Sequence, residues 1–385
     1  MTIRKPISKL STYRLRGVRN NPSVLTKVKE VCAQNKAIIF FAEDRADWIH
    51  IGPIADRLER LGHPVLRLTT DPNDTAVTQH NGLFVGGTLS ATQLFLRLPP
   101  CVVVMTMTDL GTFHLKRSIH DVHYVYIFHS LLSTHRAYRA NAFDAYDSIL
   151  CSSPYHFSEL TKVATTRPDR VQTLYETGYC RLDSLMSETE PVCEPAHDYP
   201  RVLIAPTWGP SSLLNFNIES IIQNLLDESI EVILRFHPMS LRHNSALSDQ
   251  FSERFGQHLL FSLDRRFEST EAYLKSDIVL SDWSGAAHEF SLGLLRPAIF
   301  IDTPIKANNN IFQRLDLVCY EDVVRDALGS LVGLDQTGEV PSIVMSLLDS
   351  SHDWKETLGT LRDDTIFNPG CAVEVAARQI SELVS

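Results

Sequence analysis

Short apolar runs alternate along the chain with longer amphipathic segments, which is the pattern of strands and helices built around parallel sheets. In the first half of the chain, the apolar runs predict strands at Ala37–Phe41, Val65–Thr69, Cys101–Met105, His123–Phe128 and Ser148–Cys151. Apolar residues at helical spacing predict a helix over Trp48–Leu61 that ends at Gly62. The first half therefore has the strand–helix repeat of a Rossmann-like domain.

The alternation stops at Met186–Pro200 and then begins again. This stretch contains three prolines, several acids and no clear period, so it predicts a linker between two domains. Beyond it, the pattern predicts strands at Arg201–Ala205, Glu231–Phe236, Asp277–Ser281 and Ala298–Ile301, and helices at Ile218–Leu226, Ser269–Ser276 and Gly285–Leu294. The last segment, Ser351–Val384, predicts a helix that is broken near Asn368-Pro369-Gly370.

A chain of 385 residues suits about two α/β domains. We therefore expect an α/β protein with two Rossmann-like domains that face each other across a cleft. The expected parts are an N-terminal domain over residues 1–190, a C-terminal domain over residues 195–350, and C-terminal helices over residues 351–385 that pack back on the N-terminal domain.

Polar side chains directly follow four of the predicted strands. In open parallel sheets, ligands bind outside the carboxyl ends of the strands, because loops and helix N-termini meet there. The residues at these positions are His129, Pro206-Thr207-Trp208, His237-Pro238 and Ser281-Asp282-Trp283-Ser284-Gly285.

The segment Ser281–Gly285 joins a strand directly to a helix, so it presents free backbone N–H groups and the positive end of the helix dipole. Ser284 can cap the helix or donate its hydroxyl to a phosphate oxygen, and Gly285 lets the backbone approach a ligand closely. The alternative is an ordinary N-cap, which fixes the helix and binds nothing.

Two of the strand ends carry a histidine. Arg235 and His237 are two residues apart and lie on the same side of a strand, where both can reach a diphosphate. His129 can act as a general base on an acceptor hydroxyl, because imidazole titrates near neutral pH. The neighbouring basic residues offer positive charge for a phosphorylated acceptor: His123, His135, Arg136 and Arg139. The alternative for either histidine is a packed side chain bonded to the backbone.

Composition narrows the class of protein. A net charge of −10 argues against nucleic-acid binding, which needs a basic surface. Residues 1–21 are an exception, since they contain no acid and can lie on an anionic membrane surface or form a solvated arm. The basic residues of this arm are Arg4, Lys5, Lys9, Arg14, Arg16 and Arg19.

Seven cysteines without a C-x-x-C pair predict reduced thiols in a cytoplasmic protein and no zinc site. No apolar stretch approaches the ~20 residues that span a bilayer, so lipid-linked material would be met at the inner face of the plasma membrane as a peripheral contact. The sequence also lacks a P-loop, a G-x-G-x-x-G motif after the first strand, a G-x-S-x-G elbow and an obvious D-x-D metal site.

Six short motifs occur in order between about residues 123 and 303. They are Ile127-Phe128-His129, Thr177-Gly178-Tyr179-Cys180-Arg181-Leu182-Asp183, Ala205-Pro206-Thr207-Trp208, Arg235-Phe236-His237-Pro238, Ser281-Asp282-Trp283-Ser284 and Arg296-Pro297-Ala298-Ile299-Phe300. As an ordered set they resemble the CDP-glycerol glycerophosphotransferase family, the teichoic-acid primases and polymerases with a GT-B fold. The chain departs from the family pattern at Ser130, Trp283, Gly285 and Cys180, where the family usually has Gly, Tyr, Ser and Pro.

The resemblance implies an enzyme with a GT-B-like fold, without a cofactor or a metal ion. It implies transfer of glycerol phosphate, or a similar polyol phosphate, from a CDP-linked donor to a hydroxyl of a glycan or lipid-linked acceptor, with direct displacement of CMP. The candidate catalytic residues are His129 and His237. The candidate donor-binding residues are Thr207, Trp208, Arg235, Ser281, Asp282, Ser284 and Gly285. The candidates for the acceptor side or the domain junction are His135, Arg136, Arg181 and Asp183.

Two other functions are compatible with the same residues. One is a GT-B glycosyltransferase that uses a CMP- or UDP-activated sugar in capsule or lipopolysaccharide assembly. The other is a non-catalytic nucleotide-binding module. This alternative stays open because Ser130 follows His129, where the family usually has Gly.

Overall fold

The structure is a computed structural model that describes residues 24–33, 36–75, 82–166, 172–188, 199–266 and 269–384. The basic arm at residues 1–21 lies outside the described residues, as does most of the predicted linker, residues 189–198. The linker also begins later than predicted, because Met186 still belongs to helix α7 (Cys180–Glu188).

Seven strands of the described N-terminal half form one parallel sheet in the order β3-β2-β1-β4-β5-β6-β7. Their bounds are β1 (Ile38–Ala42), β2 (Val65–Thr69), β3 (Leu83–Phe84), β4 (Cys101–Met105), β5 (Val122–Ile127), β6 (Ser148–Cys151) and β7 (Thr173–Glu176). The accompanying helices are α1 (Val24–Cys32), α2 (Trp48–Arg60), α4 (Thr88–Phe95), α5 (Thr134–Ala137) and α6 (Pro154–Thr165). The two strands at the centre, β1 and β4, are apolar throughout because helices cover both faces of the sheet.

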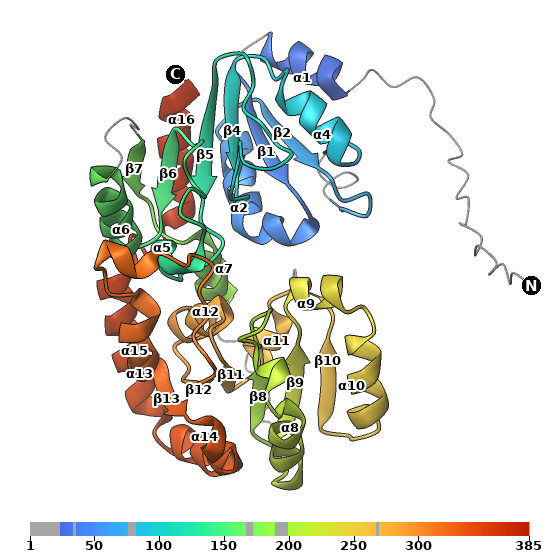
Figure 1. Ribbon diagram of the computed structural model, residues 1–385, viewed down its shortest axis with the longest axis vertical. Coiled ribbons are helices and arrows are strands. Elements are labelled where there is room, and N and C mark those ends of the chain that lie inside the picture. The colour runs from blue at the N-terminus through green and yellow to red at the C-terminus, as the bar shows by residue number, and fades with distance from the viewer. Residues whose placement is uncertain are drawn as a thin grey trace, which may run out of the picture.

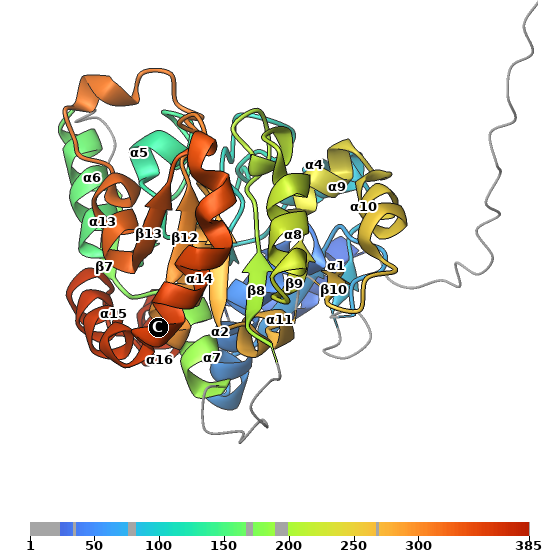
Figure 2. The same ribbon diagram turned by 90° about the horizontal axis from the view of Figure 1, so that it is seen from below.

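The C-terminal half repeats this design with a six-stranded parallel sheet in the order β10-β9-β8-β11-β12-β13. Its strands are β8 (Arg201–Ile204), β9 (Glu231–Arg235), β10 (Phe261–Asp264), β11 (Ile278–Ser281), β12 (Ala298–Ile301) and β13 (Gly329–Val332). Its helices are α8 (Ile218–Asp227), α9 (Pro238–His243), α10 (Leu247–Phe255), α11 (Glu271–Lys275), α12 (Gly285–Leu294), α13 (Tyr320–Leu328) and α14 (Val340–Asp349). Figure 2 shows α8 and α14 side by side on one face, and α12 and α13 pack on the other.

In each sheet the strand order reverses once, between β1 and β4 and again between β8 and β11. The chain leaves the two central strands in opposite directions at such a point, which opens a crevice at their carboxyl ends. Figure 1 shows the two sheets one above the other, so these crevices face each other.

The last two helices pack on different halves of the molecule. Helix α15 (Ser351–Thr365) packs on α12 and α13, whereas α16 (Ala372–Val384) lies on α2 and β4 of the N-terminal half (Figure 1). The predicted break between them is confirmed, since Asn368 and Gly370 have positive φ values of 46° and 79°. The crossing chain therefore ties the two sheets together a second time. Among the described residues, no helix combines the length and the apolar character needed to cross a bilayer.

Most predicted elements are present within one or two residues, and β2, β4, β6 and α12 have the predicted bounds. Four strands of the structure were not predicted from the sequence: β3, β7, β10 and β13. All four lie at the edges of the two sheets. Edge strands have one strand neighbour and stay more exposed, so their sequences are short or polar and lack the apolar run that marks a central strand.

Candidate active site between the two domains

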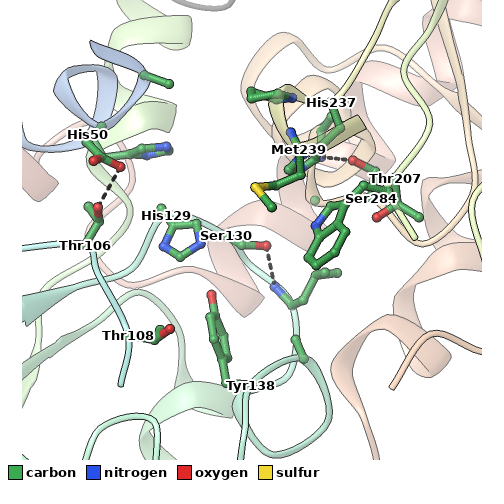
Figure 3. A pocket seen from close by; sticks show the side chains of 18 of the residues that line it. His50, Thr106, Thr108, His129, Ser130, Tyr138, Thr207, His237, Met239 and Ser284 are labelled. Carbon is green, nitrogen blue, oxygen red and sulfur yellow. Dashed lines mark hydrogen bonds between the residues drawn. The ribbon is translucent and has the colours of Figure 1, made fainter. Parts of the chain in front are cut away.

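A cavity of about 750 Å³ lies between the carboxyl ends of the two sheets. The N-terminal side contributes the segments that follow β1, β4 and β5, and we call these lining residues the N-terminal wall. The C-terminal side contributes the segments that follow β8, β9, β11 and β12, which we call the C-terminal wall. Figure 3 shows His129 and His237 on opposite sides of this space.

His129 directly follows β5 and lines the cavity. Burial lowers the pKa of its imidazole, although a hydrogen bond from the ring to the backbone of Thr106 partly opposes this effect. The ring is therefore neutral near pH 7, and the nitrogen that does not donate to Thr106 can accept a proton. Rings of His50 and Tyr138 lie 6.2 and 5.9 Å from it, centroid to centroid. His129 thus has the protonation state that a general base needs.

His237 follows β9 and caps helix α9, since its Nδ1 accepts a hydrogen bond from Met239 N at 3.1 Å. Burial, together with the nearby charges of Lys306, His129 and Arg242, lowers the pKa of His237 to about 3. The ring is neutral, and because Nδ1 is the acceptor, the proton is on Nε2. His237 can therefore donate one hydrogen bond to a ligand but has no spare basic nitrogen.

The side chain of Asp282 fixes the loop that follows β8 through two hydrogen bonds. The two oxygens of this buried carboxylate accept hydrogen bonds from Thr207 N at 2.8 Å and Leu213 N at 2.7 Å. Thr207 and Trp208 consequently line the cavity, as the sequence predicts, whereas Asp282 does not. Ser281 is also buried, and its hydroxyl donates to Ala205 O at 2.6 Å. The structure thus places Ser281 and Asp282 outside the cavity lining, where their side chains bond to the segment that follows β8.

Ser284 and Gly285 start helix α12 at the cavity wall. The Ser284 hydroxyl caps the helix by accepting a hydrogen bond from Ala286 N at 3.3 Å, which leaves its O–H free to donate. A Cβ at Gly285 would lie 2.6 Å from Ser130 Oγ, next to His129. The helix N-terminus therefore reaches the opposite domain beside the candidate base, and a larger residue at this position would force the Ser130 hydroxyl to move.

Lys306 lies beyond β12 and is a cavity residue that sequence reasoning missed. Its Nζ donates to Thr207 Oγ1 at 2.6 Å and lies 4.7 Å from the centre of the Trp208 ring. Burial lowers the pKa of Lys306 to about 8, and the Asp282 carboxylate opposes this shift. Sequence reasoning looked only at residues that directly follow a strand, and four residues separate Lys306 from Ile301 at the end of β12.

Arg235 and Arg181 line the cavity but already have acidic partners. Arg235 forms an ion pair with Asp264, in which its Nε donates at 2.6 Å, and its Nη2 donates to Ser269 O. Arg181 Nε lies 4.0 Å from a carboxylate oxygen of Glu289. Both guanidinium groups contribute positive charge near the C-terminal wall, and Arg181 is the one less tightly bound to an acid.

Besides Ser281 and Asp282, three predicted residues lie outside the cavity: His135, Arg136 and Asp183. Asp183 Oδ2 accepts a hydrogen bond from Val373 N at 2.8 Å and so holds α16 on α7. The His135 ring lies between Cys319 Sγ, at 3.3 Å, and Glu159 Oε1, at 3.3 Å. Burial alone would lower the pKa of His135, but these two partners raise it to about 10. Of the two places expected for His135 and Arg136, the acceptor side or the domain junction, the structure puts both residues at the junction.

Arg136 is 1% exposed and joins α5 to α13 across that junction. Its Nη2 lies 2.9 Å from Glu321, and its Nη1 lies 2.7 Å from Asp322. Arg136→Met removes the partner of the buried Glu321 carboxylate and is expected to lower the free energy of unfolding by ~3–5 kcal/mol, measured by urea denaturation.

The matched control is Arg254→Met, because Arg254 pairs with Glu219 at the surface, where both side chains are about half exposed. We expect this control to change the free energy of unfolding by only ~0–1 kcal/mol. An equal loss in the two variants would show that the Arg136 pairs do not stabilise the junction.

The N-terminal wall contains further residues that the sequence did not single out. Asp47 accepts hydrogen bonds from Thr106 Oγ1 at 2.9 Å and Glu43 N at 2.8 Å, and burial, aided by the Asp44 carboxylate, raises the pKa of Asp47 to about 7. His50 is 7% exposed and its Nδ1 has no hydrogen-bond partner among the described residues. Glu43 and Asp44 directly follow β1, so the strand-end rule applied to that strand would have found this wall.

Two Rossmann-type domains with a charged, histidine-lined cavity between them are the architecture of the GT-B fold. The sequence model of the CDP-glycerol:poly(glycerophosphate) glycerophosphotransferase family matches residues 108–307, which is more than half of the chain. The chain therefore belongs to this family, and it is a transferase of the CDP-glycerol glycerophosphotransferase type. No protein with a curated description matches it by sequence.

Solved structures agree with the fold. The wall teichoic acid polymerase TagF superimposes with a TM-score of 0.59 at 14% identity, over 91% of this chain and 89% of that chain. MnaA of S. aureus, solved with UDP, gives a TM-score of 0.61 at 13% identity, over 90% and 96% of the two chains. UDP-GlcNAc 2-epimerase of Neisseria meningitidis, bound to UDP-GlcNAc, gives 0.53 at 12% identity, over 90% and 98%. At these identities the likeness establishes the GT-B architecture alone.

Proposed function

We propose that this chain transfers glycerol phosphate, or a similar polyol phosphate, from a CDP-linked donor to a hydroxyl of a cell-surface glycan or lipid-linked acceptor. The observation that carries the proposal is the pairing of two neutral histidines on opposite walls of one cavity, with different hydrogen-bonding roles. His129 keeps a basic nitrogen, and His237 offers only an N–H donor.

The donor diphosphate is assigned to the C-terminal wall. Lys306 supplies an ammonium group there, His237 an Nε2–H donor, and the start of α12 its free backbone N–H groups. Thr207 and Trp208 lie beside Lys306 and give this end of the cavity a polar and an aromatic surface for the rest of the donor.

The reaction is a direct displacement at the β-phosphorus. The acceptor oxygen forms a new bond to phosphorus, its proton moves to the unprotonated ring nitrogen of His129, and the bond to the CMP oxygen breaks with its electrons leaving on CMP. Little covalent chemistry is required of the protein, so its contribution is to position the reactants and to stabilise charge on the phosphate oxygens.

A thermal-shift screen with CDP-glycerol, CDP-ribitol, CMP-sugars and UDP-sugars tests the donor. A ligand present at ~100 times its dissociation constant adds ~2.7 kcal/mol to the stability, so the true donor class is expected to stand out. Phosphorus NMR of the product then separates the two transferase reactions. A phosphodiester retains the β-phosphate of the donor, whereas a glycoside contains none and would establish a sugar transferase instead.

Lys306 predicts how donor binding depends on pH. Its ammonium group is charged below its pKa of about 8 and loses the charge above it, so affinity for an anionic donor falls as the pH rises. We expect the dissociation constant of the donor to rise about tenfold between roughly pH 7 and pH 9.5, measured by calorimetry. The pKa of His237 is about 3, so this ring does not titrate in that range.

Lys306→Arg is the control, because a guanidinium stays charged throughout this range. The variant is expected to show a flatter profile than the unchanged protein. The same decline in both proteins would assign the pH dependence to another group.

A further inference from the structure

Helix α7 lies between the two halves of the molecule and packs on both α2 and α12 (Figure 1). Each of these three helices contributes a polar side chain to the cavity: His50 from α2, Arg181 from α7 and Glu289 from α12. We call these residues, together with Tyr179 and Tyr273 beside Glu289, the junction pocket. The donor contacts proposed above use none of them.

His50 has lost its contact with water without gaining a hydrogen bond. Its side chain lines the cavity but the residue is only 7% exposed, and its Nδ1 has no partner in the described part of the chain. The rings of His129 and Tyr179 lie 6.2 and 5.8 Å from it, and Figure 3 shows His50 and His129 on the same side of the cavity. Burial, with His129 and Arg181 nearby, lowers the pKa of His50 well below its ordinary value. The ring is therefore neutral, with one N–H donor and one acceptor nitrogen.

Arg181 is buried in the same way. It is 3% exposed, and its Nε has no hydrogen-bond partner among the described residues. The Glu289 oxygen beside this Nε is 4.0 Å away, which is too far for a hydrogen bond. Buried polar groups in folded proteins are nearly always hydrogen-bonded. Two unpartnered groups that line one cavity therefore mark a place where a ligand completes their hydrogen bonds.

Glu289 supplies acceptors to the same pocket. The Tyr179 hydroxyl donates to its Oε1 at 2.6 Å, and the Tyr273 hydroxyl lies 3.4 Å from its Oε2. Burial raises the pKa of Glu289, while Arg181 and the two tyrosines act against this shift. In either protonation state the carboxyl group keeps the capacity to accept further hydrogen bonds. The pocket thus combines the donors of Arg181, the acceptors of Glu289 and one of each from His50.

The position of the pocket indicates which part of the substrate it meets. In the proposed displacement, the phosphorus under attack lies close to His129, and the polyol is joined to that phosphorus through one oxygen. The polyol therefore lies beside His129, where His50 is the neighbouring side chain. Glu289 is about one turn along α12 from its start, where the diphosphate is assigned. Hydroxyl groups both donate and accept hydrogen bonds, so they suit a pocket that offers both.

We propose that the junction pocket binds the hydroxyl groups of the polyol in the CDP-linked donor. His50 bonds to one hydroxyl through a ring nitrogen, and Arg181 and Glu289 bond to its neighbour. These contacts give the enzyme its preference for a polyol over a donor group without hydroxyls. The inference rests on the proposed function, because it takes the diphosphate to lie at the start of α12.

Two probes that differ only in the polyol test the pocket. They are CDP-glycerol and the methyl ester of CDP, which has the same diphosphate and the same charge but no polyol hydroxyls. We expect CDP-glycerol to bind the full chain about tenfold or more tightly than the methyl ester, measured by calorimetry. His50→Phe keeps an aromatic ring and removes both nitrogens, so it should reduce this ratio about three- to tenfold. Its affinity for the methyl ester should stay within about twofold of the original.

Two further variants keep the test independent of one substitution. His50→Asn retains a donor and an acceptor and should keep more of the preference than His50→Phe. Arg181→Lys retains the charge but has fewer donors, so it should also reduce the ratio. His120→Phe is the matched control, because His120 is exposed and outside the cavity lining, and it should leave the ratio unchanged. Circular dichroism checks that each variant is folded.

Equal binding of the two probes by the unchanged protein would overturn the inference, as would an unchanged ratio in folded His50→Phe. An equal loss of affinity for both probes in that folded variant would assign His50 to the diphosphate and would also overturn it. If the inference fails in these ways while CMP is released from CDP-glycerol, the transferase proposal stands. If neither probe binds and no CMP is released, the proposed function fails and this inference fails with it.

Discussion

His129→Ala is expected to lower kcat by about 10²–10⁴-fold while donor affinity stays within a few-fold of the original. The reason is that His129 is a neutral imidazole on the N-terminal side of the cavity, with one unprotonated ring nitrogen, whereas His237 uses its own Nδ1 to cap α9. Steady-state kinetics with saturating donor measure the loss, and calorimetry measures donor binding in the same preparation.

The pH profile provides a second readout for the same residue. Burial lowers the pKa of His129 below its ordinary value, so the base stays deprotonated and kcat stays high at neutral pH, and kcat falls only on the acid side of the ordinary histidine range. The acid limb of the profile should disappear in His129→Ala. His120→Ala is the control, because His120 is exposed and outside the cavity, and it should keep nearly full turnover. Near-normal kcat in His129→Ala would remove the residue from the mechanism.

His237→Ala is expected to lower kcat/KM by about 10²–10³-fold, the range seen when one preorganised donor to a developing oxyanion is removed. Because the pKa of His237 is about 3, the ring is a neutral donor at every practical pH, and the loss should be the same from roughly pH 6 to pH 9. Single-turnover measurements with bound donor separate this loss from weaker binding.

His237 also caps α9, so the alanine variant removes two interactions at once. His237→Asn separates them, since an asparagine oxygen can accept the hydrogen bond from Met239 N while its short side chain lacks the reach of Nε2. The asparagine variant should fold with normal stability and remain as inactive as His237→Ala. Recovery of activity in His237→Asn would mean that the histidine matters only as a helix cap.

The central strands, and the order in which they occur along the chain, were predictable because each is marked by the residues of its own segment. A buried parallel strand is a run of apolar residues wherever it occurs, as in Cys101–Met105 and Arg201–Ile204. The edge strands β7 and β10 were not predictable in this way, since a strand exposed on one side is specified by the neighbour that it meets. Helix α9 was not predictable either, because it has only six residues and its start is set by the cap at His237.

The sequence by itself determined which polar side chains stand at the ends of strands: His129, Thr207, Trp208, His237 and Ser284. This follows because the strand, its end and the next residue are adjacent in the chain. Only the tertiary structure decided which hydrogen-bond and ion-pair partners these and other polar side chains have. Arg136 meets Glu321 at a separation of 185 residues, and Asp282 holds Thr207 at a separation of 75. Hydrogen-bond partners depend on which segments the fold brings together, so the place of Lys306 beside Thr207, and of His129 and His237 on one cavity, became visible only in the tertiary structure.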